Sequence, residues 1–383
     1  MYDFDEIVNR NTPEDIKYER IDGIDDLIPM WVADMDFRSP KEVIDSLVKV
    51  SQNGVFGYSE ADEFYDKALT DWFKKRYDWN VDPKTVLKLP GVVLGVSLSI
   101  RALTKPGDSV MIFEPLYGPI GRAVKGNDRK LVISDLVCAG SRYEIDFEDA
   151  ERKIKENSVK MLVLCNPHNP VGRVWKREEL LRIGDLCLKN HVIIVSDEIH
   201  ADFIYSGHKH IPIASLSEEL NKITVTCTSA TKSFNIAGIQ AANIVIADDS
   251  MRRAVDKCSL ATGAFGHNIM GIAATRSAYQ YGEEWLDELN RYIEGNYELV
   301  KSRLADTKLK VTDVEGTYLI WIDASEVDSE NPARLFLDKT HIRFSEGVFF
   351  SKSAKGFIRM NIACPRSVVN EALDRMIKLP EIH

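Results

Sequence analysis

The sequence predicts an α/β protein, with a large domain built on a mostly parallel β-sheet sandwiched by helices, plus a smaller α+β domain. The first observation is that short apolar runs alternate with amphipathic stretches through the middle of the chain. Parallel neighbours need crossover connections, and helices supply them. The second observation is a change of pattern near residue 283, where a long helical stretch precedes two more strand-like runs.

Each element is expected from its local pattern. Apolar runs predict strands of the large domain at 86–89, 109–113, 130–134, 161–165, 192–196, 223–226 and 243–247. Amphipathic stretches between them predict helices, including 93–104, 146–155 and 177–190. In the small domain we expect a helix at 285–304 and strands at 318–322 and 357–362. The expected division is a large domain at 48–282 and a small domain formed by 1–47 with 283–383.

The composition argues against nucleic-acid and membrane partners. With 383 residues, 44% hydrophobic and 28% charged, the chain is long enough for two hydrophobic cores. A formal charge of −10 without a clustered Lys/Arg run argues against a nucleic-acid partner. The chain has no apolar run long enough to cross a bilayer, and its acidic start is unlike a secretory signal, so we expect no membrane partner and a cytoplasmic location. The six scattered cysteines are typical of buried free thiols.

Chemistry is expected at the carboxyl ends of the strands, because parallel sheets bind ligands there. Asp197 follows the predicted strand 192–196, where its carboxylate could meet a buried cation; alone, it would more often be a helix cap or a solvated loop residue. Lys232 lies among small hydroxylated residues after strand 223–226. That setting suits a Schiff-base lysine flanked by phosphate donors, although an isolated lysine is more often a surface residue.

A competing interpretation of this segment is a serine nucleophile. Ser229 and Lys232 form the Ser-x-x-Lys motif of penicillin-binding proteins and β-lactamases. Those enzymes also need S-D-N and K-T-G, and neither triplet occurs in this sequence. The strand-to-loop position of Ser229 also differs from the helix start that such a nucleophile uses.

Three further segments carry residues typical of ligand sites. The turn that contains Asn169 has two prolines and a glycine, and such rigid turns hold an amide side chain in place. Gly91, Val92 and Val93 open a predicted helix, where free backbone N–H groups favour an anion. The pair formed by His208 and His210 resembles metal ligands, but no Cys/His set completes a site, so we expect a solvated loop and no metal.

Together these segments resemble the class I/II aminotransferase superfamily of fold-type I enzymes that depend on pyridoxal 5'-phosphate (PLP). The resemblance covers nearly the whole chain. The segments that carry it, in chain order, are Pro106-Gly107-Asp108, Pro115-Leu116-Tyr117, Asn169-Pro170-Val171-Gly172, Asp197, Ser229-Ala230-Thr231-Lys232 and Arg359-Met360-Asn361-Ile362.

The resemblance implies roles around the cofactor ring. Lys232 would carry PLP as a Schiff base and then move protons at the substrate Cα. Asp197 would pair with the protonated ring nitrogen, which keeps the ring an electron sink. Asn169 would donate to the ring oxygen, and Tyr117 would stack on the ring face. His200 stands where many members have tyrosine, and it could still donate to the ring oxygen.

The resemblance also implies phosphate and substrate contacts. The phosphate cup would be formed by backbone N–H groups and one hydroxyl, from Gly91, Val92, Val93 and Ser229. Gln240 stands where many members have an arginine against the phosphate, so its role is an open assignment. Tyr58 would reach the active site of a second subunit, which implies a homodimer with shared sites. Arg359, with Asn169 and Tyr58, would bind the amino-acid substrate, since a planar guanidinium suits its carboxylate.

Four longer segments resemble the cystathionine β-lyase (C–S lyase) branch of the superfamily: 29–37, 196–202, 315–318 and 359–366. This resemblance implies α,β-elimination from sulfur amino acids such as cystathionine or cysteine, giving thiol, pyruvate and ammonia. Two alternatives stay open at this point. One is a class I/II aminotransferase, and the other is a PLP-binding regulatory protein with residual lyase activity.

Overall fold

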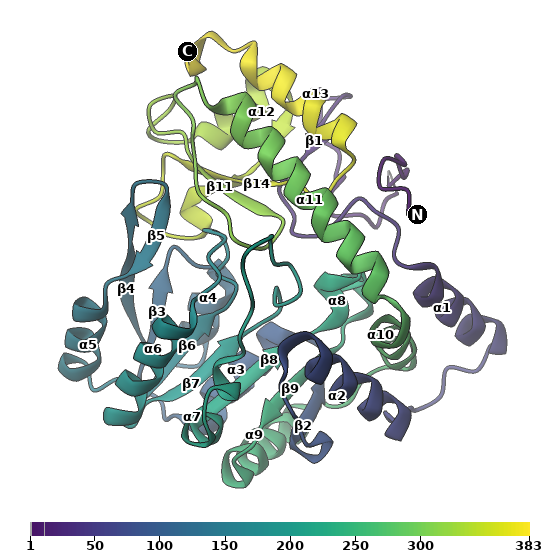
Figure 1. Cartoon of the computed structure of the whole chain (residues 1–383), viewed down its shortest axis with the longest axis vertical. Helices are drawn as coiled ribbons and strands as arrows, with labels where there is room; N and C mark the ends of the chain where they lie inside the picture. The colour runs from purple at the N-terminus through teal and green to yellow at the C-terminus, as the bar shows by residue number, and fades with distance from the viewer. Residues whose placement is uncertain (1, 11) are drawn as a thin grey trace.

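A computed structural model describes residues 2–10 and 12–383, and its largest element is an eight-stranded sheet in the lower part of Figure 1. The strand order is β2-β9-β8-β7-β6-β3-β4-β5. The strands are β2 (Val86–Leu89), β3 (Ser109–Glu114), β4 (Lys130–Ala139), β5 (Arg142–Ile145), β6 (Met161–Cys165), β7 (Ile193–Asp197), β8 (Thr224–Thr228) and β9 (Ala242–Ile246). The seven predicted strands are therefore confirmed, and β5 is an addition.

The centre of this sheet is parallel and its edges are not. Strands β8, β7, β6, β3 and β4 run parallel, whereas β9 runs antiparallel to both β8 and β2, and β5 is antiparallel to β4. The chain between β8 and β9 stays at the carboxyl edge of the sheet instead of crossing back, so β9 must run in the opposite direction. The predicted mostly parallel sheet is confirmed, because its five central strands are parallel.

Helices cover both faces of the large sheet, because successive strand side chains point to opposite sides. Val110 and Ile112 of β3 pack with α3, α4 and α9, whereas Met111 and Phe113 pack with α5, α6 and α7. The helices of this part are α1 (Lys41–Asn53), α2 (Glu63–Tyr77), α3 (Val92–Leu103), α4 (Gly118–Gly126), α5 (Phe147–Glu156), α6 (Arg177–Lys189), α7 (Glu218–Ile223), α8 (Ala230–Ser233), α9 (Asp249–Thr262) and α10 (Ile269–Tyr281).

A second, smaller sheet lies above the first in Figure 1, in the yellow-green part of the chain. It is antiparallel, with the order β10-β11-β14-β13. The elements of this C-terminal part of the chain are α11 (Glu283–Leu304), β10 (Lys310–Val311), β11 (Leu319–Asp323), α12 (Pro332–Thr340), β12 (Ile342–Arg343), β13 (Ser345–Glu346), β14 (Phe357–Asn361) and α13 (Arg366–Ile377). The N-terminal β1 (Ile28–Pro29) pairs in parallel with β12, so the start of the chain joins this part.

The five 3-10 helices are η1 (Pro83–Thr85), η2 (Ile213–Ser215), η3 (Ala237–Ile239), η4 (Gly347–Phe349) and η5 (Pro380–Ile382) within the described residues. The predicted division at 47/48 falls inside α1, and the division at 282/283 falls where α10 meets α11. One continuous hydrophobic cluster includes side chains of α1, α2, α10, α11, β11 and β14. The exact domain boundaries therefore stay predictions.

A buried ion network joins the part with the large sheet to the part with the small sheet, beside the turn that follows β6. The guanidinium of Arg173 is fully buried, and it donates to Glu315 Oε2 at 2.9 Å and to both carboxylate oxygens of Glu179 at 2.8 Å. The backbone N–H groups of Glu315 and Gly316 both donate to the carbonyl oxygen of Gly172, at 2.8 and 3.1 Å. Because Asn169 lies in the same turn, this junction fixes the position of a predicted site residue.

Other classes of element are absent from the part of the chain that the structure describes. None of its helices is both long and apolar enough to span a bilayer. Within residues 2–10 and 12–383, no group of three or more His, Cys, Asp or Glu side chains is arranged to hold a metal ion. The six cysteines form no disulfide, and four of them are buried.

Replacing Gly172 with alanine should destabilise the fold more than the same change at Gly140. Both glycines have φ of 70°, which costs alanine about 1–2 kcal/mol. A Cβ at Gly172 would also lie 2.7 Å from Val314 Cγ1, adding roughly 1–3 kcal/mol of overpacking, whereas a Cβ at Gly140 meets nothing within 4 Å. Urea unfolding of Gly172→Ala and Gly140→Ala measures the difference. Equal losses of unfolding free energy would contradict the proposed packing of this junction.

Candidate active site

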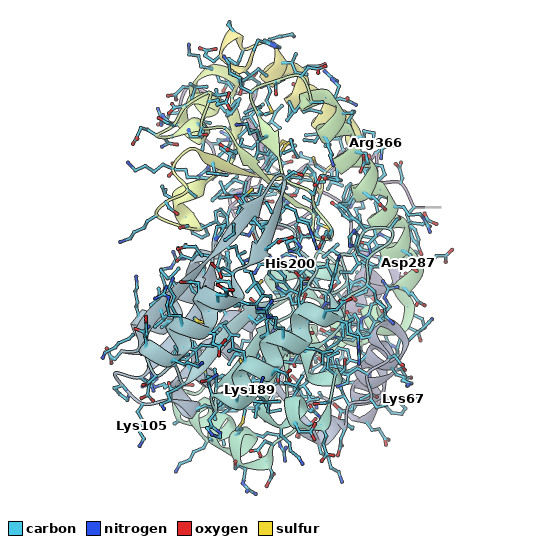
Figure 2. All side chains as sticks on the ribbon, turned by 60° about the vertical axis from the view of Figure 1, so that its left-hand side comes forward. Lys67, Lys105, Lys189, His200, Asp287 and Arg366 are labelled. Carbon is cyan, nitrogen blue, oxygen red and sulfur yellow. The ribbon has the colours of Figure 1, made fainter. Side chains whose placement is uncertain are left out.

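A cavity of about 550 Å³ opens at the carboxyl edge of the large sheet. Figure 2 shows His200, one of its lining residues, in the middle of the molecule between the two parts. The lining comes from turns after β2, β6, β7 and β8 and from the N-terminal segment. The predicted site residues that line the cavity are Gly91, Val92, Val93, Tyr117, Asn169, Asp197, His200, Lys232 and Gln240.

Asp197 is the last residue of β7 and is almost fully buried. Its Oδ1 accepts a hydrogen bond of 3.2 Å from the backbone N–H of Ile199. Burial raises the pKa of Asp197 to about 6, although the positive charge of Lys232 acts in the opposite direction. Because burial disfavours its charged form, a cationic ligand group beside this carboxylate would be stabilising.

His200 lies one turn further on and is also buried. Burial lowers its pKa to about 3, with smaller contributions from the charges of Lys232 and Arg359. The imidazole is therefore neutral at pH 7, and its Nδ1 has no hydrogen-bond partner in the described structure. A neutral imidazole in this position can donate or accept a hydrogen bond, but it does not add positive charge.

Lys232 lies in the short helix α8 and projects into the cavity. Its Nζ donates to the backbone carbonyl of Ala33, which belongs to the N-terminal segment. Burial lowers the pKa of Lys232 to about 8, while Asp34 opposes that shift and Arg359 adds to it. The lysine is thus poised to lose its proton near neutral pH, as a nucleophilic or basic amine requires.

Ser229 lies at a helix start, so the expectation of a strand-to-loop position unlike a helix start was wrong. Its hydroxyl donates to Ala241 O at 2.5 Å and accepts from the backbone N–H of Thr231 at 3.0 Å, so it caps α8. Thr231, rather than Ser229, lines the cavity. The sequence offered no signal to choose between the two hydroxyls, because both flank Lys232 within the same short segment. The phosphate role of Ser229 stays a prediction.

Arg359 and Asn169 meet although they are far apart in the sequence. Arg359 projects from β14 and its Nη1 donates to Asn169 Oδ1 at 3.1 Å, while its Nη2 donates to Trp31 O at 2.7 Å. Burial lowers the pKa of Arg359 to about 10. Its Nε is buried and has no partner within the described residues. An unsatisfied buried donor is costly, so an anionic ligand would be stabilised there.

The start of α3 faces the same cavity. Gly91 is the N-cap, no side chain caps the helix, and Val92 and Val93 begin it. Uncapped N–H groups at a helix start favour a phosphate. Gln240, with φ of 55°, adds a neutral amide to this wall, and Tyr117 lies on another side beside Phe349.

Tyr58 does not line the cavity of its own chain. It lies between α1 and α2, its side chain is fully exposed, and the neighbouring Val55 and Phe56 are also exposed. The structure thus separates Tyr58 from the other predicted site residues of the same chain.

The prediction of a solvated loop for the two histidines was wrong for His210. That residue is buried, and its Nε2 lies 2.9 Å from Glu198 Oε2, whereas His208 is exposed. Glu198 also accepts a hydrogen bond from Ser196 at 2.8 Å. Local polarity of the Gly-His-Lys-His run did not indicate that the chain folds His210 beneath β7, because that contact is tertiary.

Sequence reasoning also missed three residues that fix the N-terminal segment beside the reactive lysine. Ala33 accepts from Lys232, Tyr318 OH donates to the same Ala33 oxygen at 2.9 Å, and Asn361 donates to the carbonyls on either side. Asn361 belongs to the Arg-Met-Asn-Ile segment that supported the family resemblance, but its type alone gave no role.

Comparisons with known proteins agree with this arrangement. A family model for aminotransferase class I and II matches residues 25–376, and the chain therefore belongs to that family. It is 39% identical over 382 residues to cystathionine beta-lyase PatB of Bacillus subtilis, covering 97% of this chain and 98% of PatB. Cystalysin of Treponema denticola, whose structure contains a pyridoxal 5'-phosphate cofactor, superposes with a TM-score of 0.95 at 35% identity and covers 99% of this chain and 98% of its own.

A PLP-bound C-S lyase from Staphylococcus hominis is also similar, with a TM-score of 0.92 and 32% identity. The match covers 98% of this chain and 97% of that structure. The similarity therefore includes both sheets.

Removing the carboxyl of Asp197 should stabilise the cofactor-free chain at neutral pH. Its pKa is raised in the folded state, so ionisation costs folding free energy as the pH rises from about 4, the unfolded value, to above 6. Asp197→Asn should therefore gain up to about 3 kcal/mol at pH 7 and nothing below pH ~4. Urea unfolding at both pH values measures the gain. An equal difference at the two pH values would show that Asp197 is not buried as described.

Proposed function

We propose that this chain is a PLP-dependent carbon–sulfur β-lyase that cleaves sulfur amino acids such as cystathionine to a thiol, pyruvate and ammonia. The observation that carries the proposal is the full-length 39% identity to a cystathionine beta-lyase, combined with a cavity lined by Lys232, Asp197 and Asn169 and with Arg359 hydrogen-bonded to Asn169. Each of these side chains has a task in that reaction.

The residues present fit PLP. Bound there, PLP would supply an electron sink that stabilises negative charge at the substrate Cα. Lys232 supplies the amine that would hold its aldehyde, and the buried carboxyl of Asp197 would pair with its ring nitrogen. The uncapped N–H groups at the start of α3 would hold its phosphate. Asn169 and His200 offer polar groups for the ring oxygen.

Lys232 would then act as the base. As a free amine it takes the Cα proton; the Cβ–S bond breaks, and the sulfur leaves with the bonding electron pair and gains a proton to give a thiol. Water completes the conversion of the three-carbon residue to pyruvate and ammonia. The lowered pKa of Lys232 favours this role, because a base must be unprotonated at the working pH.

Arg359 would bind the substrate carboxylate. Its guanidinium is fully buried, held by Asn169 and Trp31 O, and keeps one donor without a partner in the described structure. A buried guanidinium binds a carboxylate strongly, because little water competes for either group.

We also propose that the enzyme is a cytoplasmic homodimer in which Tyr58 contributes to the site of the partner. The exposure of Tyr58, Val55 and Phe56 on one segment outside the cavity supports an interface there. The unpaired state of all six cysteines supports a reducing compartment.

Purified protein loaded with PLP should form pyruvate and a free thiol from L-cystathionine without any keto-acid acceptor. Elimination needs no second substrate, whereas transamination does. Pyruvate is measured by coupled reduction with lactate dehydrogenase, and thiol by a disulfide dye. If turnover required 2-oxoglutarate, the chain would be an aminotransferase and the lyase proposal would fall.

Two lysine variants control this assay. Lys232→Ala should lose both the yellow absorbance of the loaded enzyme and its turnover, because it lacks the amine that holds the cofactor. Lys257→Ala changes an exposed lysine of α9 and should leave both unchanged. Retention of the absorbance in Lys232→Ala would place the cofactor on another residue.

Mixing two inactive variants should restore activity if Tyr58 acts across the dimer. In a hybrid of Tyr58→Phe and Lys232→Ala chains, one of the two sites contains both Tyr58 and Lys232. Random mixing should then recover roughly a quarter of wild-type turnover. The measurement is the pyruvate rate after the variants are unfolded and refolded together. No recovery, with hybrids verified by mass spectrometry, would assign Tyr58 to its own chain or to no site.

A further inference from the structure

The N-terminal strap, residues 31–36, crosses the cavity beside Lys232, and buried side chains bind its carbonyl groups one after another. Trp31 O accepts from Arg359 at 2.7 Å and from Ser345 at 2.9 Å. Ala33 O accepts from Lys232 and from Tyr318. These four bonds restrict two peptide groups of the strap, so its orientation beside Lys232 is fixed.

Asn361 fixes the peptide groups on both sides of Ala33. Its Nδ2 donates to Val32 O at 2.5 Å and to Asp34 O at 2.6 Å, and its Oδ1 accepts from the backbone N–H of Ala363 at 2.8 Å. The side chain is buried and uses both amide protons on the strap. The direction of the Ala33 carbonyl, which lies between these two anchors, is thereby set.

Tyr318 binds the same carbonyl oxygen as Lys232. Its ring is fully buried, edge-on to Phe203 at 4.8 Å and to His200 at 5.7 Å between ring centroids, and its hydroxyl donates to Ala33 O at 2.9 Å. A carbonyl oxygen has two lone pairs, so both donors can bind at once. Two donors on one oxygen share its electron density, and each bond is weaker than it would be alone.

Resting on the lyase function proposed above, we propose that Tyr318 and Asn361 are positioning residues that set, through the Ala33 carbonyl, how strongly the free amino group of Lys232 holds a proton. Asn361 aims the carbonyl at Nζ and so favours the charged ammonium. Tyr318 donates a second hydrogen bond to the same oxygen, which weakens the bond from Lys232 and so favours the neutral amine. The balance decides how much of Lys232 is available as a base.

The charged groups around Lys232 do not account for this control. Asp34 and Asp197 favour its protonated form, and Arg359 disfavours it. His200, which is neutral at pH 7, faces the same side chain. Neither Tyr318→Phe nor Asn361→Ala removes any of these groups. A changed Lys232 pKa in Tyr318→Phe would therefore report the carbonyl, whereas Asn361→Ala also frees the peptide of Asp34, whose charge favours the ammonium.

The two variants should move the pKa of Lys232 in opposite directions. Tyr318→Phe keeps the buried ring and removes the competing donor, so the pKa should rise by about half a unit. Asn361→Ala frees the strap peptides, so the pKa should fall by a similar amount. Competitive acetylation of the cofactor-free full chain with acetic anhydride, followed across roughly pH 6–10 by mass spectrometry of the peptide that contains Lys232, measures it.

Two matched variants remove the same groups elsewhere. Asn127 donates to Ala123 O at 2.8 Å and to Ser97 Oγ at 2.9 Å, so Asn127→Ala loses a comparable amide bridge away from the strap. Tyr205 has a buried hydroxyl without a partner in the described residues, so Tyr205→Phe is the phenol control. Both should leave the Lys232 pKa unchanged. Thermal unfolding of all four variants identifies any that do not fold.

Turnover separates this inference from the proposed function. In the loaded enzyme at pH 7, Tyr318→Phe should lower kcat for L-cystathionine about three-fold, since half a pKa unit leaves about three-fold less neutral amine, and KM should not change. If Tyr318→Phe leaves the Lys232 pKa where it is, the inference fails even in an active lyase. If the pKa moves as stated but cystathionine is not cleaved, the proposed function fails and the control of Lys232 stands.

Discussion

The constraint on which the site depends is the parallel direction of the central strands. Because β6, β7 and β8 run the same way, the turns that follow them open at one edge and bring Asn169, Asp197 and Lys232 to one cavity. The opposite direction of β9 does not change this arrangement, since β9 lies beyond β8 and carries none of these three residues. The chemistry thus follows from a backbone rule rather than from any one side chain.

The second sheet contributes Arg359, which the first sheet has no residue to replace. Arg359 of β14 meets Asn169, and the N-terminal strap is fixed between β14 and Lys232. The buried pair formed by Arg173 and Glu315 joins the two parts at the turn that carries Asn169. Breaking such a pair by removing one partner leaves an uncompensated charge, so the junction resists small displacements.

Burial gives the cavity its chemical character. It raises the pKa of Asp197 and lowers those of Lys232, His200 and Arg359, in each case by disfavouring the charged form. These shifts cost folding free energy, and a ligand with complementary charges offsets that cost. The side chains that give the site its chemistry are therefore the same ones that lower the stability of the fold.

The sequence by itself determined the order and type of the elements, because periodicity and turn chemistry are local, and its family resemblance singled out Lys232, Asp197, Asn169 and Arg359. Only the tertiary structure decided that Ser229 caps α8, that His210 is buried on Glu198, and that Tyr318 and Asn361 converge on the strap. Asn361 and Val32 are 329 positions apart. Contacts at such separations depend on how two sheets pack, and no pattern within a short window records that packing.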